Sequence, residues 1–257
     1  MKKLFLPVTI ILIVVSVACL ITFEIVHVRI LEDNIANKFL TGFFSRFSLS
    51  LLFVWLLLFF GGKEMLFCNR KALKGLAWSL PCFMVAFVNY PYSAIANGTA
   101  TIDRYDLMGL YILYIIGIAL LEEIVFHGVI FVLAKDYLKN KRHAPLLITI
   151  VTAILFSLFH LTNLFSGADV GFTLLQCAYT FLIGAMLTVL MLKLNNLWLC
   201  FLIHALFDFG GLIIIHIGSG NAWDTTFWVL TIVSGLLCAG HIIYSLIKLD
   251  RNYVPGI

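Results

Sequence analysis

The segment "LLEEIVFHGVIF", residues 120–131, places two adjacent carboxylates and a histidine inside an apolar stretch. These residues are Glu122, Glu123 and His127. An ionisable side chain at membrane depth costs at least about 2.5–3.5 kcal/mol on insertion scales, so such residues usually face a polar cavity. The segment therefore predicts a membrane-spanning helix that carries part of a functional site.

The composition extends this prediction to the whole chain. Of its 257 residues, 62% are hydrophobic and 12% are charged, and the mean hydropathy is +1.07. A soluble domain has about 25% charged residues, whereas about 20 apolar residues suffice for a helix to cross a bilayer. We predict an all-α polytopic membrane protein that forms a single transmembrane domain over residues 1–257. Eight spans are expected, at 4–23, 43–60, 76–90, 107–134, 146–161, 171–192, 197–217 and 225–247, and the third of these contains Pro81.

The positions of lysine and arginine predict the orientation, because cytoplasmic loops carry an excess of both. With the N-terminus inside, 13 of the 17 basic residues fall in cytoplasmic segments. The other four, placed outside, are Arg29, Lys38, Arg46 and Arg104. Both termini are therefore expected in the cytoplasm, and residues 24–42 are expected to form an amphipathic surface helix. The net charge of +4 follows from this topology and does not indicate a nucleic-acid partner.

Three more ionisable residues lie within predicted spans: His160 in the fifth, and His204 and Asp208 in the seventh. At a rise of about 1.5 Å per residue, Glu122 and His160 lie about 18 and 21 Å from the cytoplasmic ends of their helices. His204 and Asp208 lie about 10 and 16 Å from theirs. These similar depths predict one enclosed site built from three helices.

Three short motifs carry a family resemblance. "EEIVFH" (122–127), "FSLFH" (156–160) and "HALFD" (204–208) occur in this order on successive apolar helices. They resemble the Glu-Glu-x-x-x-Arg, Phe-x-x-x-His and His-x-x-x-Asn/Asp motifs of the CPBP family, which comprises type II CAAX prenyl proteases and bacteriocin-processing or Abi proteins. The family core would cover approximately residues 75–215.

The resemblance implies an eight-helix intramembrane endopeptidase with a conical cavity open to the cytoplasm. Carried over by position, Glu122 and His160 would activate the attacking water, and His204 and Asp208 would stabilise the oxyanion. Glu123 and His127 would support these groups. His127 stands where the family has arginine, and it replaces a permanently charged, bidentate clamp with a residue that is often neutral near pH 7.

Several alternatives remain open at the level of sequence. If the site held zinc, its ligands would be Glu122, Glu123, His160 and His204, although we favour a mechanism without a cofactor. The polar cluster could instead be structural, or the protein could be a non-catalytic scaffold or immunity protein that binds a peptide in the same cavity. A proton-coupled transporter is disfavoured because the sequence shows no inverted repeat.

The composition and short loops are typical of a low-GC bacterial protein of the plasma membrane. The expected partners are membrane lipid and a membrane-associated peptide or anchored protein substrate. Family relatives suggest roles in peptide processing, quorum sensing or bacteriocin immunity, which is an analogy at family level.

Overall fold

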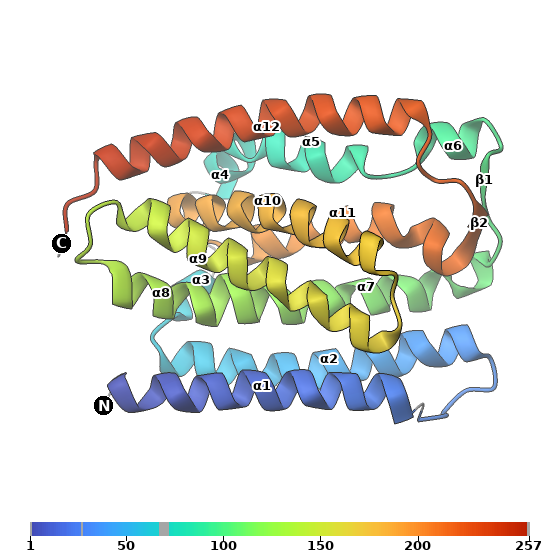
Figure 1. The fold of residues 1–257 in the computed structure, drawn as a ribbon, viewed down its shortest axis with the longest axis horizontal. Coiled ribbons are helices and arrows are strands. Elements are labelled where there is room, and N and C mark those ends of the chain that lie inside the picture. Colours follow the sequence, from blue (N-terminus) through green and yellow to red (C-terminus); the bar gives the residue numbers. More distant parts are fainter. Residues whose placement is uncertain (1, 27, 67–71, 256–257) are drawn as a thin grey trace.

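The computed structural model describes residues 2–26, 28–66 and 72–255, which fold into helices aligned along one axis (Figure 1). The first half contains α1 (Lys2–Val26), α2 (Asn34–Phe59), α3 (Lys63–Leu66), α4 (Ala72–Trp78), α5 (Leu80–Val88), α6 (Tyr92–Ala96), β1 (Ala100–Ile102) and η1 (Tyr105–Leu107). The second half contains α7 (Met108–Glu122), the π-helix η2 (Glu123–Ile130), α8 (Phe131–Leu138), α9 (Ala144–Phe159), the 3₁₀-helix η3 (His160–Ser166), α10 (Val170–Leu194), α11 (Leu197–Ile217), β2 (Gly218–Gly220) and α12 (Thr225–Arg251).

Six helical segments of the described chain are long and apolar enough to cross a membrane. They are Asn34–Phe59, Tyr105–Leu138, Ala144–Ser166, Val170–Leu194, Leu197–Ile217 and Thr225–Arg251. The first and third expected spans correspond to shorter apolar helical stretches, Pro7–Leu20 and Leu80–Ala96. An almost all-helical integral membrane protein is therefore confirmed, whereas the count of eight spans stays a prediction.

The third expected span is broken twice. The helix ends at Trp78, resumes at Leu80 with Pro81 in its first turn, and breaks again before Pro91. Proline lacks the N–H that would continue a helix and restricts the residue before it, so both breaks follow from the sequence.

The prediction of a separate amphipathic surface helix over residues 24–42 is wrong. In the described residues α1 continues to Val26, and α2 begins at Asn34, nine positions before the expected start of the second span at residue 43. Asp33 fixes this start because its carboxylate accepts the backbone N–H groups of Ile35 and Ala36, each at 2.9 Å. Arg46, expected in an outside segment, lies within α2, with its guanidinium carbon 5.4 Å from the centre of the Tyr114 ring.

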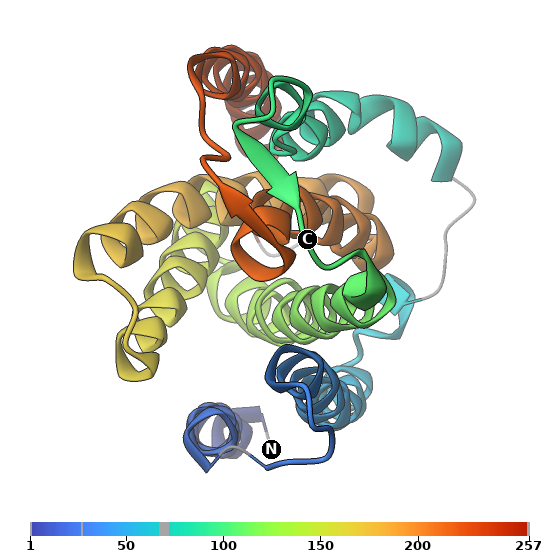
Figure 2. The same cartoon turned by 90° about the vertical axis from the view of Figure 1, so that its right-hand side faces the viewer.

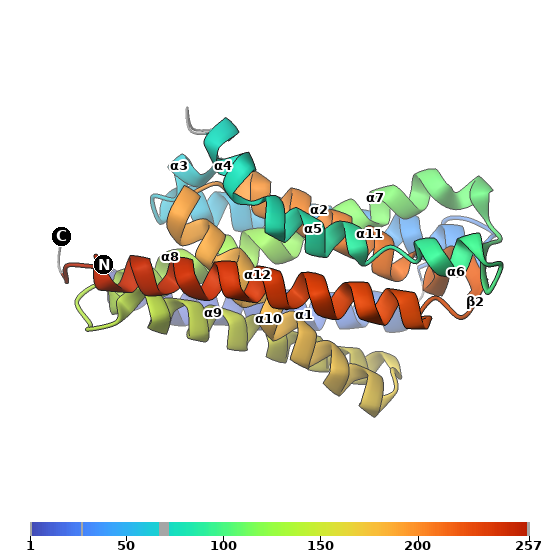
Figure 3. The ribbon, with the colours of Figure 1, turned by 90° about the horizontal axis from the view of Figure 1, so that it is seen from above.

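The helices form layers around α7, η2 and α11. Viewed along the bundle, α1 and α2 lie on one side, α5 and α12 on the opposite side, and α9 and α10 flank the centre (Figure 2). From above, α12 runs along the length of the bundle (Figure 3). The larger hydrophobic core includes Phe53, Ile124, Phe156, Leu187 and Ile203, each at most 2% exposed. The site residues therefore lie on helices that are covered from several sides.

One end of the bundle carries a two-stranded antiparallel ribbon that the all-helical prediction did not include. Ala100 pairs with Gly220, and Ile102 pairs with Gly218. A Cβ atom at Gly218 would lie 2.3 Å from the backbone oxygen of Thr101 in β1, and one at Gly220 would lie 2.2 Å from that of Thr99, just before β1. The close approach therefore requires glycine at both positions. The start of α1 and the end of α12 lie together at the opposite end of the bundle (Figure 1). This arrangement agrees with termini on one side of the membrane, while the side itself stays a prediction.

Candidate active site

The two adjacent glutamates stand at a change of helix type. Glu122 is the last residue of α7, and Glu123 is the first residue of the π-helix η2, which gives way to α8 at Phe131. Single π-helical turns inside longer helices occur frequently at functional sites. At this junction both glutamates reach the same histidine of α11, His204, from a helix whose regular geometry would turn them about 100° apart.

Glu123 is fully buried between two histidines. Its Oε1 lies 2.7 Å from Nδ1 of His204, and its Oε2 lies 3.0 Å from Nδ1 of His127. The first contact is a hydrogen bond, whereas in the second both atoms are buried and have no hydrogen-bond partner among the described residues. Both side chains of the Glu123–His127 pair have 0% exposure. A buried carboxylate requires partners of this kind, so Glu123 is placed to orient His204.

His127 also connects η2 to α10. Its Nε2 lies 3.2 Å from the backbone oxygen of Gly184, and this nitrogen must donate because a carbonyl oxygen only accepts. The ring can therefore contact Glu123 with one nitrogen and α10 with the other. It occupies the position of the family arginine and contacts Glu123, as expected for that residue.

Glu122 and His160 face each other across a gap. Nε2 of His160 lies 3.9 Å from Oε2 of Glu122, which is too far for a direct hydrogen bond. Nδ1 of His160 donates to the backbone oxygen of Phe156 at 3.0 Å, so in the neutral ring Nε2 is an acceptor. Oε2 of Glu122 is buried and has no hydrogen-bond partner among the described residues. One water molecule can bridge two acceptors at this separation by donating to both.

His204 lies between the two glutamates and Asp208. Its Nε2 is 3.8 Å from Oε2 of Glu122 and 3.4 Å from Oδ2 of Asp208. The side chains of Glu122 and Asp208 are 13% and 16% exposed, compared with 4% for His204. The two carboxyl groups therefore lie on the less buried side of the cluster.

The ring of Phe156 packs at the centre of the three histidines. Its centroid lies 5.1 Å from that of His160 and 5.6 Å from those of His127 and His204, all in edge-to-face or near edge-to-face arrangements. The sequence motif contained this phenylalanine but gave no indication of its contacts with all three rings. Phe156 is fully buried, so it fixes the relative positions of the histidines.

Residues 105–210 match the family model described as type II CAAX prenyl endopeptidase, Rce1-like. The matched segment belongs to the Rce1-like family. It contains all six residues predicted from the motifs, and the match confirms the predicted family. No curated protein and no solved structure matches the chain. The Rce1-like family is a protease family, so the match supports a protease.

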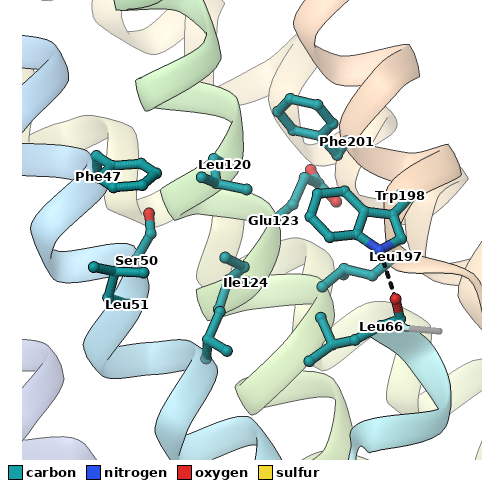
Figure 4. Close-up of a pocket in the computed structure, with 11 residues that line it drawn as sticks. Phe47, Ser50, Leu51, Leu66, Leu120, Glu123, Ile124, Leu197, Trp198 and Phe201 are labelled. Atoms are coloured by element: carbon teal, nitrogen blue, oxygen red, sulfur yellow. Dashed lines mark hydrogen bonds between the residues drawn. The ribbon is translucent and has the colours of Figure 1, made fainter.

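The Rce1-like segment also contributes to an apolar cavity of about 160 Å³. The cavity lies between α2, the α7–η2 helix and α11, and Glu123 lies beside the rings of Trp198 and Phe201 (Figure 4). Trp198 donates its indole N–H to the backbone oxygen of Leu66 at 2.7 Å, which ties α11 to α3. Glu122 and His160 do not line this cavity, so it is separate from the gap between them. The conical cavity expected from the family stays a prediction.

The four residues expected as zinc ligands lie in one cluster, in which several of their possible ligand atoms face one another. Both carboxylate oxygens of Glu123 face histidine nitrogens, and Nδ1 of His204 faces Glu123. In the described residues, no group of three or more histidine, cysteine, aspartate or glutamate side chains is arranged to hold a metal ion. The geometry of this Rce1-like site therefore does not fit the four-ligand set.

Proposed function

We propose that this protein is an intramembrane endopeptidase that hydrolyses a peptide bond with a water molecule activated by Glu122 and His160. The observation that carries the proposal is the 3.9 Å separation between Oε2 of Glu122 and Nε2 of His160. Both atoms are acceptors in the forms described above, so a water molecule between them presents its oxygen lone pairs to a third group. A peptide carbonyl carbon in that position is the expected target.

Glu122 acts as the general base in this mechanism. As the water oxygen bonds to the carbonyl carbon, one water proton passes to Glu122, while the hydrogen bond to His160 orients the water. The carbonyl oxygen becomes an oxyanion. Glu122 then delivers the proton to the leaving nitrogen, and the carbon–nitrogen bond breaks to give a carboxylic acid and an amine.

His204 stabilises the oxyanion. Its Nδ1 donates to Glu123, whose carboxylate favours the imidazolium form of the ring. In that form Nε2 also carries a proton and can donate to the developing negative charge. Asp208 lies 3.4 Å from the same nitrogen. An ionised carboxylate would repel an oxyanion, so Asp208 acts either in its protonated form or by orienting His204 alone.

The proposed substrate is a small membrane-associated peptide or anchored protein. The description of the matching family names CAAX prenyl endopeptidases, which supports a substrate with a lipid anchor or an apolar segment. The composition favours a bacterial plasma membrane, where peptide processing, quorum sensing or bacteriocin immunity would supply such substrates. Membrane lipid is the expected surrounding partner, and the reaction needs no cofactor.

The proposal is tested with purified protein in lipid nanodiscs and an internally quenched peptide that ends in a farnesylated Cys-aliphatic-aliphatic-X sequence. Wild-type protein should cleave this probe, and Glu122→Gln should not, while its expression and melting temperature stay close to wild type. Cleavage should survive dialysis against a strong chelator, and the protein should contain less than stoichiometric zinc. Loss of activity with the metal would contradict the cofactor-free mechanism.

The scaffold alternative predicts a different result. In cells, a binding function would survive Glu122→Gln, because the amide keeps the size of the side chain and its capacity for hydrogen bonds. A deletion phenotype restored equally by wild type and Glu122→Gln would contradict a biological role that requires proteolysis.

A further inference from the structure

Three polar side chains outside the motifs lie next to the catalytic residues. They are Asn163 on η3, and Gln176 and Tyr179 on α10. Nδ2 of Asn163 donates to Oε1 of Gln176 at 2.8 Å, which joins the two elements. All three residues are partly buried within segments long and apolar enough to span a membrane. Their hydrogen-bonding groups therefore require polar partners at this depth.

The position of this polar group follows from the helix geometry. In a 3₁₀-helix side chains three residues apart lie one above the other, so Asn163 lies on the same face of η3 as His160, about 6 Å farther along the axis. On α10, Gln176 and Tyr179 are also three residues apart and share one face. The pair formed by Asn163 and Gln176 thus continues the site from His160 towards Tyr179.

Tyr179 reaches the opposite wall of the site. The centroid of its ring lies 6.0 Å from that of Phe207, the residue before Asp208 on α11. Gln176 lies on the same face of α10 as Tyr179, one turn earlier. The Tyr179 ring therefore packs against the part of α11 that carries Asp208.

A peptide that enters this site brings its own polar backbone. In an apolar surrounding each unpaired backbone N–H or C=O group costs several kcal/mol, and only side chains or a second backbone can pair with it. Amide and phenol groups suit this purpose because they bind any peptide backbone regardless of its side chains. None of the roles assigned to the six motif residues provides a hydrogen-bond partner for the substrate backbone next to the scissile bond.

We propose that Tyr179, supported by the Asn163–Gln176 pair, binds substrate by donating its phenolic hydrogen to a backbone carbonyl oxygen next to the scissile bond. Tyr179 is a substrate-binding residue in this account, and Asn163 and Gln176 are positioning residues. The inference rests on the proposed peptidase function and adds the part of the substrate that the site recognises.

The variant Tyr179→Phe tests the hydroxyl alone, because it retains the ring that packs against Phe207. With the farnesylated quenched peptide, KM should rise about threefold to tenfold, the range expected for one lost hydrogen bond, while kcat stays within about twofold. Gln176→Leu should change KM in the same direction. Tyr244→Phe is the matched control, since Tyr244 lies on α12 and is 66% exposed; its kinetics should equal those of wild type.

A binding measurement separates this inference from the proposed function. In the Glu122→Gln background, where no cleavage is expected, the dissociation constant of the same peptide is measured with and without Tyr179→Phe. Weaker binding by about threefold to tenfold supports the inference, even if the wild type fails to cleave the probe. Unchanged binding together with unchanged KM overturns it, while the role of Glu122 stands. A protein that neither binds nor cleaves the peptide overturns both proposals.

Discussion

Glu123 is the residue on which the arrangement of the site depends most. It is fully buried, and its two carboxylate oxygens face histidines from η2 and α11. Removing one partner of a buried ionic cluster leaves a charge without compensation, which costs more than the pair itself contributes. Substitutions around Glu123 should therefore affect stability and activity together, in contrast to substitutions of Glu122.

His127→Ala tests whether a substitution beside Glu123 lowers stability and activity together. The alanine removes the contact with Glu123 and the hydrogen bond to Gly184, and we expect the free energy of unfolding to fall by about 1–3 kcal/mol. Activity should decrease in part, because Glu122 and His160 keep their positions. Denaturant titration and peptide cleavage would be measured on the same preparation. A protein as inactive as Glu122→Gln but with wild-type stability would place His127 in the chemical step.

Asp33 gives a prediction outside the membrane. The backbone N–H of Ala36 and then the Arg104 guanidinium hold the pKa of its carboxyl below the usual range. A lowered pKa in the folded state adds stability above about pH 4, and this stability is lost as the pH falls through the lowered value. Asp33→Asn keeps a capping side chain but does not titrate.

The melting temperature of wild type should therefore fall more between pH 5 and pH 3 than that of Asp33→Asn. Scanning fluorimetry in detergent at several pH values measures the difference between the two curves. Parallel curves would show that the cap of α2 does not depend on the charge of Asp33.

At the scale of elements, the sequence predicted the helices that follow a simple apolar pattern. The seventh span, 197–217, coincides with α11, and the i,i+4 spacing of His204 and Asp208 places both on one face. The π-helix at Glu123 and the strand pair at the end of the bundle were missed. Both depend on contacts between distant segments, such as the approach of Gly218 to Thr101, which apolar periodicity does not encode.

The sequence also predicted which site residues lie close together, but not which neighbouring residues fix their positions. Depth along each helix was enough to bring Glu122, His160 and His204 together. The supporting role of Phe156 and Gly184 was not accessible, because each belongs to an apolar run in which every residue is compatible with lipid. Only the packing of α9 against α10 distinguishes these two positions.

Gly184→Ala tests that packing. An added Cβ would lie 2.9 Å from Cδ1 of Phe156 and 3.3 Å from Cα of Ala153, so α9 and α10 must separate. We expect a loss of about 1–3 kcal/mol in the free energy of unfolding and lower activity, since Phe156 contacts the histidines of the proposed site. Gly240→Ala on α12 is the matched control, because no atom lies within 4 Å of its added Cβ. Equal effects of the two substitutions would contradict the account.

At the scale of the whole molecule, the orientation rests on the basic residues. The loop around Lys141 lies at the same end of the bundle as the start of α1, and the β1–β2 ribbon lies at the other end (Figure 1). The lysine and arginine distribution predicts that the first of these ends faces the cytoplasm. This orientation decides from which side a substrate reaches the site.

Cysteine labelling measures the orientation directly. A membrane-impermeant maleimide should label Ser219→Cys in intact cells and Lys141→Cys only after permeabilisation, since both positions are exposed. The unsubstituted protein serves as the background control for its own cysteines. The opposite pattern would show that the protein has the reverse orientation in the membrane. Labelling of both sites from outside would contradict the three crossings predicted between the two positions.

The central claim is that Glu122 and His160 act together on one water molecule. Single-turnover cleavage of the quenched peptide would be measured for wild type, Glu122→Gln, His160→Ala and the double variant. Loss of a general base lowers the rate about 10²–10⁴-fold, and residues that act as a unit are not additive. We predict that each single variant falls in this range and that the double variant is little slower than either. The claim would be contradicted if the fold-loss in rate of the double variant equalled the product of the two single losses, or if cleavage survived Glu122→Gln.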